Sequence, residues 1–241
     1  MGKKTIYGQT RSKIYMRPLI ITIDGPAGAG KTTVSRALAK RLGYRYIDTG
    51  ALYRAVAFEV KSAGLDPCDE TELESLCRHL KLKYEIDGSS MRLLSNNLDI
   101  TGQIRSQEIA MLASEVSAKL TVRKYLFKLQ RDLGKEGGVV FEGRDMGTVV
   151  FPDADMKFFM DASHKIRALR RYRELEPKTL KQLDEIENDI RRRDENDKTR
   201  SLAPLKPAED AVIINSTCLS VENVVDLMLT YVRRRFSLNF L

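Results

Sequence analysis

The sequence predicts an α/β fold of three layers, in which helices cover both faces of a parallel core sheet. Short apolar, β-branched segments alternate with segments of helical spacing through most of the 241 residues. This alternation is typical of strand–helix–strand units, whose parallel strands are buried on both faces. One region, roughly 65–135, breaks the rhythm, because two polar–apolar segments flank a turn at residues 87–90. That pattern indicates an antiparallel hairpin, and therefore an inserted subdomain.

The first predicted strand, residues 19–24 (LIITID), leads directly into the loop GPAGAGKT at residues 25–32. Residues 34–43 follow with helical spacing and end at a glycine. The loop fits the pattern G-x-x-x-x-G-K-[ST] between a buried strand and a helix, which is the context that supports it. Small residues let backbone N–H groups wrap phosphates, and the helix N-terminus adds a positive dipole. The sequence therefore predicts a site for a nucleoside triphosphate.

Within this loop, Lys31 is expected to reach the β- and γ-phosphates of ATP, and the Thr32 hydroxyl to bind Mg²⁺. A GTPase would need the guanine-reading string N-K-x-D, which the sequence lacks. Motor and transporter ATPases usually end an aliphatic strand with an acidic pair, and residues 139–143 (VVFEG) offer only Glu142. The predicted ATP-binding residues are Gly25, Pro26, Ala27, Gly28, Ala29, Gly30, Lys31, Thr32 and Thr33.

The remaining core elements follow the same alternation. Strands are predicted at residues 44–48, 137–143, 156–162 and 211–216, with helices at 50–64 and 220–236. The core kinase domain is expected to comprise residues 16–64 and 136–241, and the insertion residues 65–135. Residues 1–15 are interpreted as an expression leader, a mis-assigned start or a loose basic arm.

The net charge of +8 does not by itself indicate a nucleic-acid partner. Five basic residues lie within the first 17 positions with no acid among them, so the rest of the chain carries +8 − 5 = +3. No apolar run approaches the roughly 18 residues of a membrane helix, and no membrane partner is expected. Three cysteines without a C-x-x-C pair, together with two histidines, make a disulfide framework or a structural zinc site improbable. A cytoplasmic location is therefore predicted.

Three further segments suggest a second anion site, as a small-molecule kinase would need. DTGALYR (48–54) ends a strand and opens a helix, and EGRDMGTVVFPDA (142–154) lies at the carboxyl end of another strand, where open α/β sheets bind ligands. The third segment, RRRDENDKTR (191–200), would ordinarily be a solvated face. Its residues Arg193, Asp197 and Arg200 are spaced i, i+4, i+7, so they share one face if the segment is helical.

Four segments of the chain together resemble the successive signature segments of bacterial cytidylate kinases: ITIDGPAGAGKTT, DTGALYR, GRDMGTVVFPDA and RRDENDKTRSLAPL. The resemblance extends from about Leu19 to Phe236. It implies the P-loop NTPase fold of nucleoside monophosphate (NMP) kinases, with a parallel core sheet, an NMP-binding insertion and a short helical lid, here residues 162–176. It also implies the transfer of phosphate from ATP to CMP or dCMP, with Mg²⁺.

The resemblance further implies roles for individual residues. Arg54, Arg144 and Arg200 correspond to a clamp on the CMP phosphate; Ser114, Arg123 and Asp145 to readers of cytosine; Asp197 with Arg193 to the sugar contact. The chemistry agrees with these roles, because a carboxylate accepts a hydrogen bond from the N4 amino group of cytosine and repels the O4 acceptor of uracil. The full expected CMP-binding set is Thr49, Tyr53, Arg54, Ser114, Arg123, Arg144, Asp145, Arg193, Asp197 and Arg200. The expected catalytic set is Lys31, Arg144, Arg200, Arg167 and Arg171.

The lid segment, DASHKIRALRRYRE (161–174), carries Arg167, Arg170, Arg171 and Arg173 on a helix predicted to begin near Ser163. By resemblance it closes over the ATP phosphates; a solvated basic helix is the alternative. Two positions depart from the family pattern: Lys165-Ile166 where an acidic residue is usual, and Glu142 where Asp is common.

Other functions remain open from the sequence alone. The chain could phosphorylate a different nucleotide, or be a basic, nucleotide-gated RNA-binding protein, although the core charge of +3 and the lack of stacking motifs argue against RNA. Residues 215–217 could border the adenine of ATP or simply form a turn. A monomer is expected.

Overall fold

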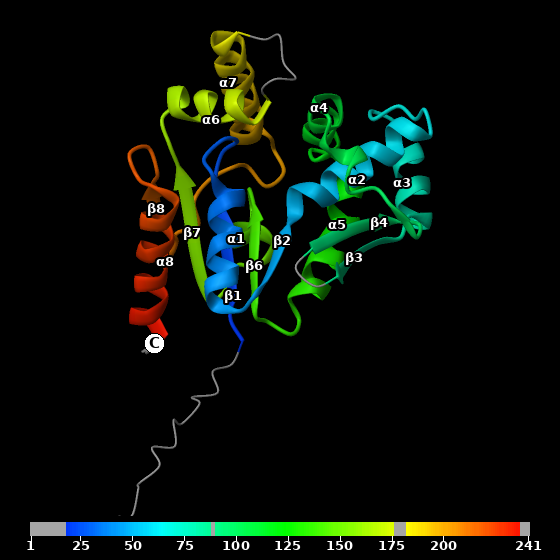
Figure 1. Cartoon of the computed structure of the whole chain (residues 1–241). Helices are drawn as coiled ribbons and strands as arrows, with labels where there is room; N and C mark the ends of the chain where they lie inside the picture. Colours follow the sequence, from blue (N-terminus) through cyan, green and yellow to red (C-terminus); the bar gives the residue numbers. More distant parts are fainter. Residues whose placement is uncertain (1–17, 88–89, 176–181, 237–241) are drawn as a thin grey trace, which may run out of the picture.

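The computed structural model describes residues 18–87, 90–175 and 182–236. The expectations for residues 1–15 lie outside these ranges. Its core is a parallel five-stranded sheet with the strand order β2-β6-β1-β7-β8 (Figure 1). The strands are β1 (Ile20–Asp24), β2 (Arg45–Asp48), β6 (Val139–Gly143), β7 (Met156–Asp161) and β8 (Val212–Asn215). The predicted α/β fold with a parallel core sheet is confirmed.

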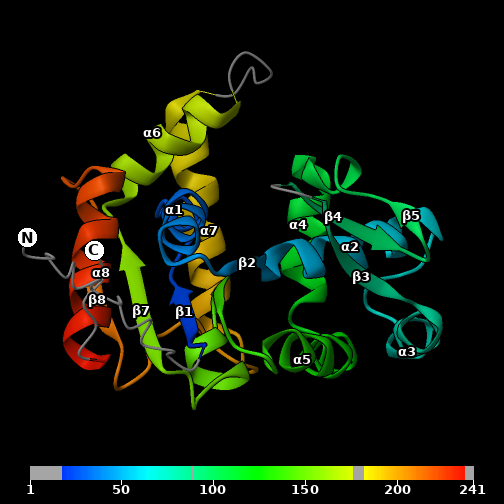
Figure 2. The ribbon, with the colours of Figure 1, turned by 60° about the horizontal axis from the view of Figure 1, so that its bottom comes forward.

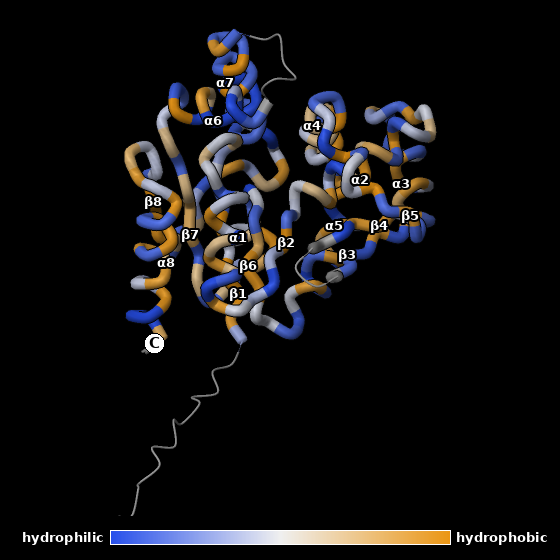
Figure 3. The backbone as a smooth tube through the Cα atoms, in the orientation of Figure 1, coloured by the Kyte–Doolittle hydropathy of each residue, from blue (hydrophilic) through white to orange (hydrophobic). Residues whose placement is uncertain are grey.

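Both faces of the sheet are covered, because its central strands are apolar on both sides. All residues of β6 are buried, as a strand in the middle of a parallel sheet requires. One face packs against α1 (Lys31–Leu42) and α8 (Val221–Phe236). The other face packs against the short π-helix η2 (Met146–Val150), with support from α5 (Leu120–Gly134). In Figure 3 the strands of the core are largely hydrophobic, whereas hydrophilic residues mark the outer sides of the helices.

The insertion forms a second, antiparallel sheet of β3 (Leu82–Asp87), β4 (Ser90–Ser95) and β5 (Leu98–Asp99). The predicted hairpin is confirmed, since β3 and β4 pair in a register that joins Asp87 to Ser90. The third strand, β5, is absent from the sequence expectation, because only two residues form it after a tight turn at Asn96–Asn97, where both residues have positive φ. The helical elements beside it are α3 (Glu70–His79), η1 (Gln103–Arg105), α4 (Gln107–Val116) and α5.

Helix α2 (Thr49–Ser62) joins the two parts. It follows β2 directly, yet most of its buried side chains belong to the hydrophobic cluster of the insertion. Figure 2 shows α2 extending from the β2 edge of the core sheet into the insertion. The domain boundaries at residues 65 and 135 stay predictions. Helix α2 lies before the boundary at residue 65, yet it packs with the insertion.

Helices α6 (His164–Leu175) and α7 (Leu183–Thr199) pack against each other above the carboxyl ends of the core strands (Figure 1). Ala168, Ile186 and Ile190 form the small apolar contact between them. The lid helix begins within one residue of its expected start, and the expected lid end at residue 176 lies outside the described residues. Across the ranges that the structure describes, none of the helices combines the length and apolarity needed to span a membrane.

Candidate active site

The glycine-rich loop between β1 and α1 adopts a conformation that only small residues permit. Gly25 has φ 145°, and a Cβ there would lie 2.0 Å from the carbonyl oxygen of Met160. Lys31 is buried, and its Nζ donates to the carbonyl oxygen of Pro26 at 2.7 Å. Burial, followed by the charge of Arg144, lowers the pKa of Lys31 to about 7. The lysine is therefore folded back across its own loop, beside backbone groups suited to phosphate.

Glu142, the last acidic residue of β6, is linked to the start of α1. Its Oε1 accepts a hydrogen bond from the Thr32 hydroxyl at 2.8 Å, and its backbone carbonyl accepts one from Thr49 at 2.6 Å. Burial, and next the neighbouring charge of Asp48, raise the pKa of Glu142. Hydroxyl and carboxylate oxygens are the ligands that Mg²⁺ prefers, and one or two from the protein suffice when phosphates supply others. The residues at this end of the loop fit a Mg²⁺ ion bound together with a nucleotide.

The segment after β6 is held by a buried carboxylate of β1. The two oxygens of Asp24 accept from the backbone N–H groups of Met146 and Gly147, at 3.0 and 2.7 Å. Burial raises the pKa of Asp24 to about 6, even though these two hydrogen bonds act to lower it. Asp24 thereby fixes the backbone just after Arg144 and Asp145, at the carboxyl end of the sheet.

Arg144 and Asp145 each pair with a residue predicted for the same site. Arg144 Nε donates to Asp197 Oδ2 at 3.1 Å. The guanidinium of Arg123 makes an ion pair with the carboxylate of Asp145, which is almost fully buried, and lies over the ring of Tyr53 at 5.8 Å. Three segments that are far apart in the sequence thus meet here: the start of α5, the loop after β6 and the end of α7.

A cavity of about 680 Å³ opens between the glycine-rich loop, α4 and α7. Its lining includes Ala27 and Gly28 of the loop on one side and Ser114 of α4 on another. The charged part of its wall is formed by residues of α4, α6 and α7 and of the segments just after α4 and α7, namely Glu115, Lys119, Arg171, Asp189, Arg192, Arg193, Asp197 and Arg200. The volume is within the range of small-molecule sites.

Positive charge is concentrated on the wall formed by α7. Burial, and next the charge of Arg144, lower the pKa of Arg193 to about 10, with Arg54 and Arg171 adding smaller repulsions. The Nε of Arg193 is buried without a hydrogen-bond partner in the described part of the chain. Burial disfavours ionisation of Asp197, but Arg144, Arg193 and Arg200 together lower its pKa. A phosphate in this cavity would relieve the repulsion among the guanidinium groups.

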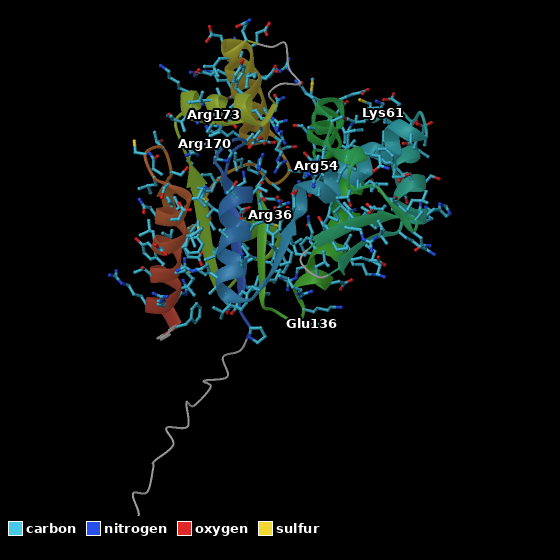
Figure 4. The ribbon with its side chains drawn as sticks, in the orientation of Figure 1. Arg36, Arg54, Lys61, Glu136, Arg170 and Arg173 are labelled. Atoms are coloured by element: carbon cyan, nitrogen blue, oxygen red, sulfur yellow. The ribbon has the colours of Figure 1, made fainter. Side chains whose placement is uncertain are left out.

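The arginines of α6 divide into different environments. Arg167 is buried, pairs with Asp194 of α7 at 2.6 Å and donates to the carbonyl oxygen of Ala27 at 3.0 Å. Arg170 donates to Ala29 and to Ser216, at distances of 2.8 to 3.1 Å. Arg171 pairs with Glu174 of its own helix, at 3.0 Å, while lining the cavity. Figure 4 labels Arg170 on α6 and Arg54 on α2, on either side of the glycine-rich loop, and also Arg173 of α6, which is exposed.

The structure therefore places the predicted residues in one region, although not all of them line the cavity. Arg54 pairs with Asp48, the N-cap of α2, at 2.8 Å, and Tyr53 lies behind the Arg123–Asp145 pair. Within the charged run, Arg193 and Asp197 face the cavity, whereas the side chains of residues 191, 195 and 198 are exposed. The shared face of Arg193, Asp197 and Arg200 is confirmed, because α7 continues to Thr199 and Arg200 caps it.

Sequence reasoning missed several residues that shape the site. Ser117 binds two predicted arginines, since its carbonyl accepts from Arg123 at 3.1 Å and its hydroxyl lies 3.4 Å from Arg200 Nη1. Asp194 is one of three acids in the charged run, yet it is buried and pairs with Arg167. Neither residue carries a motif; the helical phase of residues 183–199 is the one signal that would have separated Asp194 from its exposed neighbours.

Comparison with known proteins identifies the family. The model of a family described as cytidylate kinase matches residues 21–234. The chain belongs to the cytidylate kinase family. It is 49% identical over 220 residues to the cytidylate kinase of Geobacter sulfurreducens and 47% identical over 220 residues to that of Citrifermentans bemidjiense, covering 91% of this chain and 94% of each relative. Cytidylate kinase 1 of Haemophilus influenzae is 44% identical over 217 residues, 90% of this chain and 94% of that protein. The chain is thus a transferase, a nucleoside monophosphate kinase of the cytidylate type.

Proposed function

We propose that this cytidylate kinase transfers the γ-phosphoryl group of ATP to both CMP and dCMP, with Mg²⁺, giving ADP and CDP or dCDP. The observation that carries the proposal is one cavity lined both by the glycine-rich loop and by the arginines of α7. A donor bound to the loop and an acceptor bound by these arginines would therefore meet in the same cavity. In-line placement and neutralisation of charge are the main requirements of phosphoryl transfer.

The donor side is assigned to residues 25–33. Backbone N–H groups of the loop bind the ATP phosphates, and Lys31 leaves the Pro26 carbonyl to reach the β- and γ-phosphates. Thr32, held by Glu142, would contribute its hydroxyl oxygen to Mg²⁺. When bound, the ion would supply positive charge that helps to neutralise the phosphates of ATP. Arg167 and Arg171 approach the same phosphates from α6, and Arg170 beside Ser216 lies toward the adenine side.

The acceptor side is assigned to three arginines from different elements, of which Arg200 lines the cavity. Arg54, Arg144 and Arg200 clamp the CMP phosphate, because planar guanidinium groups bind two phosphate oxygens at once and remain protonated. Asp197 and Arg193 bind the sugar. No general base is needed, since an oxygen of the acceptor phosphate attacks the γ-phosphorus directly while the bond to the β-phosphate oxygen breaks.

Base selection is assigned to Ser114, Arg123 and Asp145. The carboxylate of Asp145 accepts a hydrogen bond from the N4 amino group of cytosine, and Arg123 donates hydrogen bonds to the N3 and O2 acceptors. Their ion pair in the structure keeps both charges compensated until the base enters. Uracil would place an acceptor against the carboxylate, which favours CMP and dCMP over UMP.

A coupled assay of ADP release with CMP, dCMP, UMP, AMP and GMP tests the proposal. CMP and dCMP should have the highest kcat/KM, and Asp145→Asn should lower the CMP-to-UMP ratio of kcat/KM by about 10². Asp153→Asn is the matched control, because that carboxylate lies in the same segment, residues 142–154, but is exposed and pairs with Arg131. Highest activity with AMP or GMP, or an unchanged CMP-to-UMP ratio in Asp145→Asn, would contradict the assignment.

The proposal also covers the oligomeric state of the enzyme and its location in the cell, for which we propose a monomer in the cytoplasm. A monomer is favoured because the insertion and the α6–α7 pair must move relative to the core as substrates enter. Cys68, Cys77 and Cys218 are free thiols, which suits the reducing cytoplasm. Sedimentation of the full chain with and without nucleotides would test the monomer.

A further inference from the structure

Tyr46 of β2 lies on the same face of the core sheet as Glu142. Strands β2 and β6 are parallel, and their register pairs Tyr46 with Val140 and Asp48 with Glu142. Because side chains alternate along a strand, all four point to one face. That face is covered by α1, whose first turn carries Thr32.

The phenol of Tyr46 completes the hydrogen bonding of Glu142. Its hydroxyl donates to Oε2 at 2.5 Å, while the Thr32 hydroxyl donates to Oε1 at 2.8 Å. Each oxygen of one carboxylate is thus fixed by a different hydroxyl, which leaves the carboxylate no freedom to rotate away from either. Tyr46 is itself held, because it packs against the main core cluster and the guanidinium of Arg36 lies 5.3 Å from the centre of its ring. Figure 4 labels Arg36 on the helix that covers this face.

The arrangement controls where the lone pairs of Thr32 point. A threonine hydroxyl has one hydrogen to donate, and Glu142 accepts it, so the hydroxyl oxygen keeps its lone pairs for a cation. If Glu142 turned, the Thr32 hydroxyl could rotate and direct its hydrogen toward the cation position instead. Partners one step removed from a metal ligand affect metal binding in this way, through the orientation of the ligand.

We propose that Tyr46 is a positioning residue for the Mg²⁺–nucleotide complex, acting through Glu142 on the Thr32 hydroxyl. The inference rests on the proposed use of Mg²⁺ with ATP. It assigns Tyr46 no contact with either nucleotide. Its effect is confined to the additional affinity that Mg²⁺ confers on a bound nucleotide.

Calorimetric titration with ADP, once with Mg²⁺ and once with a chelator, measures that additional affinity directly. The Mg²⁺ effect is the dissociation constant of ADP in the chelator divided by that in Mg²⁺. In Tyr46→Phe this ratio should fall by about tenfold, while the dissociation constant in the chelator stays unchanged. Tyr44→Phe is the matched control, because its hydroxyl also lies in a partly buried hydrogen bond, with the Leu19 amide at 3.2 Å, and its ring packs on the same cluster. It should leave the ratio unchanged.

A double-mutant cycle with Glu142→Gln identifies the route. If Tyr46 acts through Glu142, Tyr46→Phe should change the ratio no further in the Glu142→Gln background; independent, additive effects would overturn the inference. An unchanged ratio in Tyr46→Phe, or an equal loss of affinity with and without Mg²⁺, would also overturn it. A wild-type enzyme whose ADP affinity does not respond to Mg²⁺ would instead contradict the proposed use of the ion. Thermal unfolding without nucleotide checks that each variant is folded.

Discussion

Breaking the ion pair between Arg167 and Asp194 should strongly destabilise the packing of α6 against α7. Both side chains are almost fully buried, with relative exposures of 3% and 4%, and Arg167 Nη1 lies 2.6 Å from Asp194 Oδ2. The approach is off the hydrogen-bonding direction, so the attraction is mainly Coulombic. Asp194→Asn would leave the guanidinium buried with its charge uncompensated. Removing one partner of a buried pair typically costs about 3–5 kcal/mol.

The remaining contacts of Arg167 decide where in that range the loss falls. Its guanidinium also donates to the carbonyl oxygens of Ala162 and Ala27, at 2.9 and 3.0 Å, and its Nε lies 3.7 Å from Asp161. These partly compensate the charge, so a loss of about 3 kcal/mol in the free energy of unfolding is expected. For a chain of this length, that corresponds to a fall of roughly 6–12 °C in Tm.

Urea denaturation and calorimetry of Asp194→Asn measure the loss. Glu187→Gln is the control on the same helix: its carboxylate pairs with Arg191 at 2.6 Å, but the Arg191 side chain is exposed to solvent and Glu187 is only partly buried. It should change the free energy of unfolding by less than about 1 kcal/mol. The double variant Arg167→Met/Asp194→Leu should recover most of the stability, because it removes both buried charges. A loss below about 1 kcal/mol in Asp194→Asn, or equal losses in the two single variants, would refute the reasoning.

Two further predictions concern the core. The pKa of Asp24 is raised from 3.8 to about 6 in the folded state, so the folded state binds this proton more tightly than the unfolded state does. The contribution of Asp24 to the free energy of unfolding therefore falls as the pH rises toward and through 6. Between pH 5 and 7 the free energy of unfolding of the wild type should fall by about 1 kcal/mol relative to that of Asp24→Asn, and parallel pH profiles would contradict this. Gly134→Ala should destabilise by about 1–2 kcal/mol in urea, because a Cβ there would lie 2.6 Å from Cε1 of the buried Phe151 ring. Gly102→Ala, whose Cβ would meet nothing within 4 Å, should be nearly neutral, and a similar loss in both would exclude the packing explanation.

The sequence by itself determined the features whose signals are local. The glycine-rich loop could be recognised because its residues, the strand before it and the helix after it are contiguous. The face formed by Arg193, Asp197 and Arg200 follows from helical periodicity alone, because that periodicity divides the charged run into two faces of one helix with different surroundings. The hairpin of the insertion was predictable for the same reason, whereas the two-residue strand β5 was too short to leave a pattern.

Only the tertiary structure decided which side chains complete the site. Tyr46 and Glu142 are 96 positions apart, and Arg123 and Asp145 are 22 apart. No periodicity extends over such separations; the pairings arise because parallel strands end at one edge of the sheet and the helices after them pack there. The burial of Asp194, unlike its exposed neighbours, likewise depends on α6 packing against α7. Local sequence specifies which groups can bind phosphate, and packing specifies how they are held.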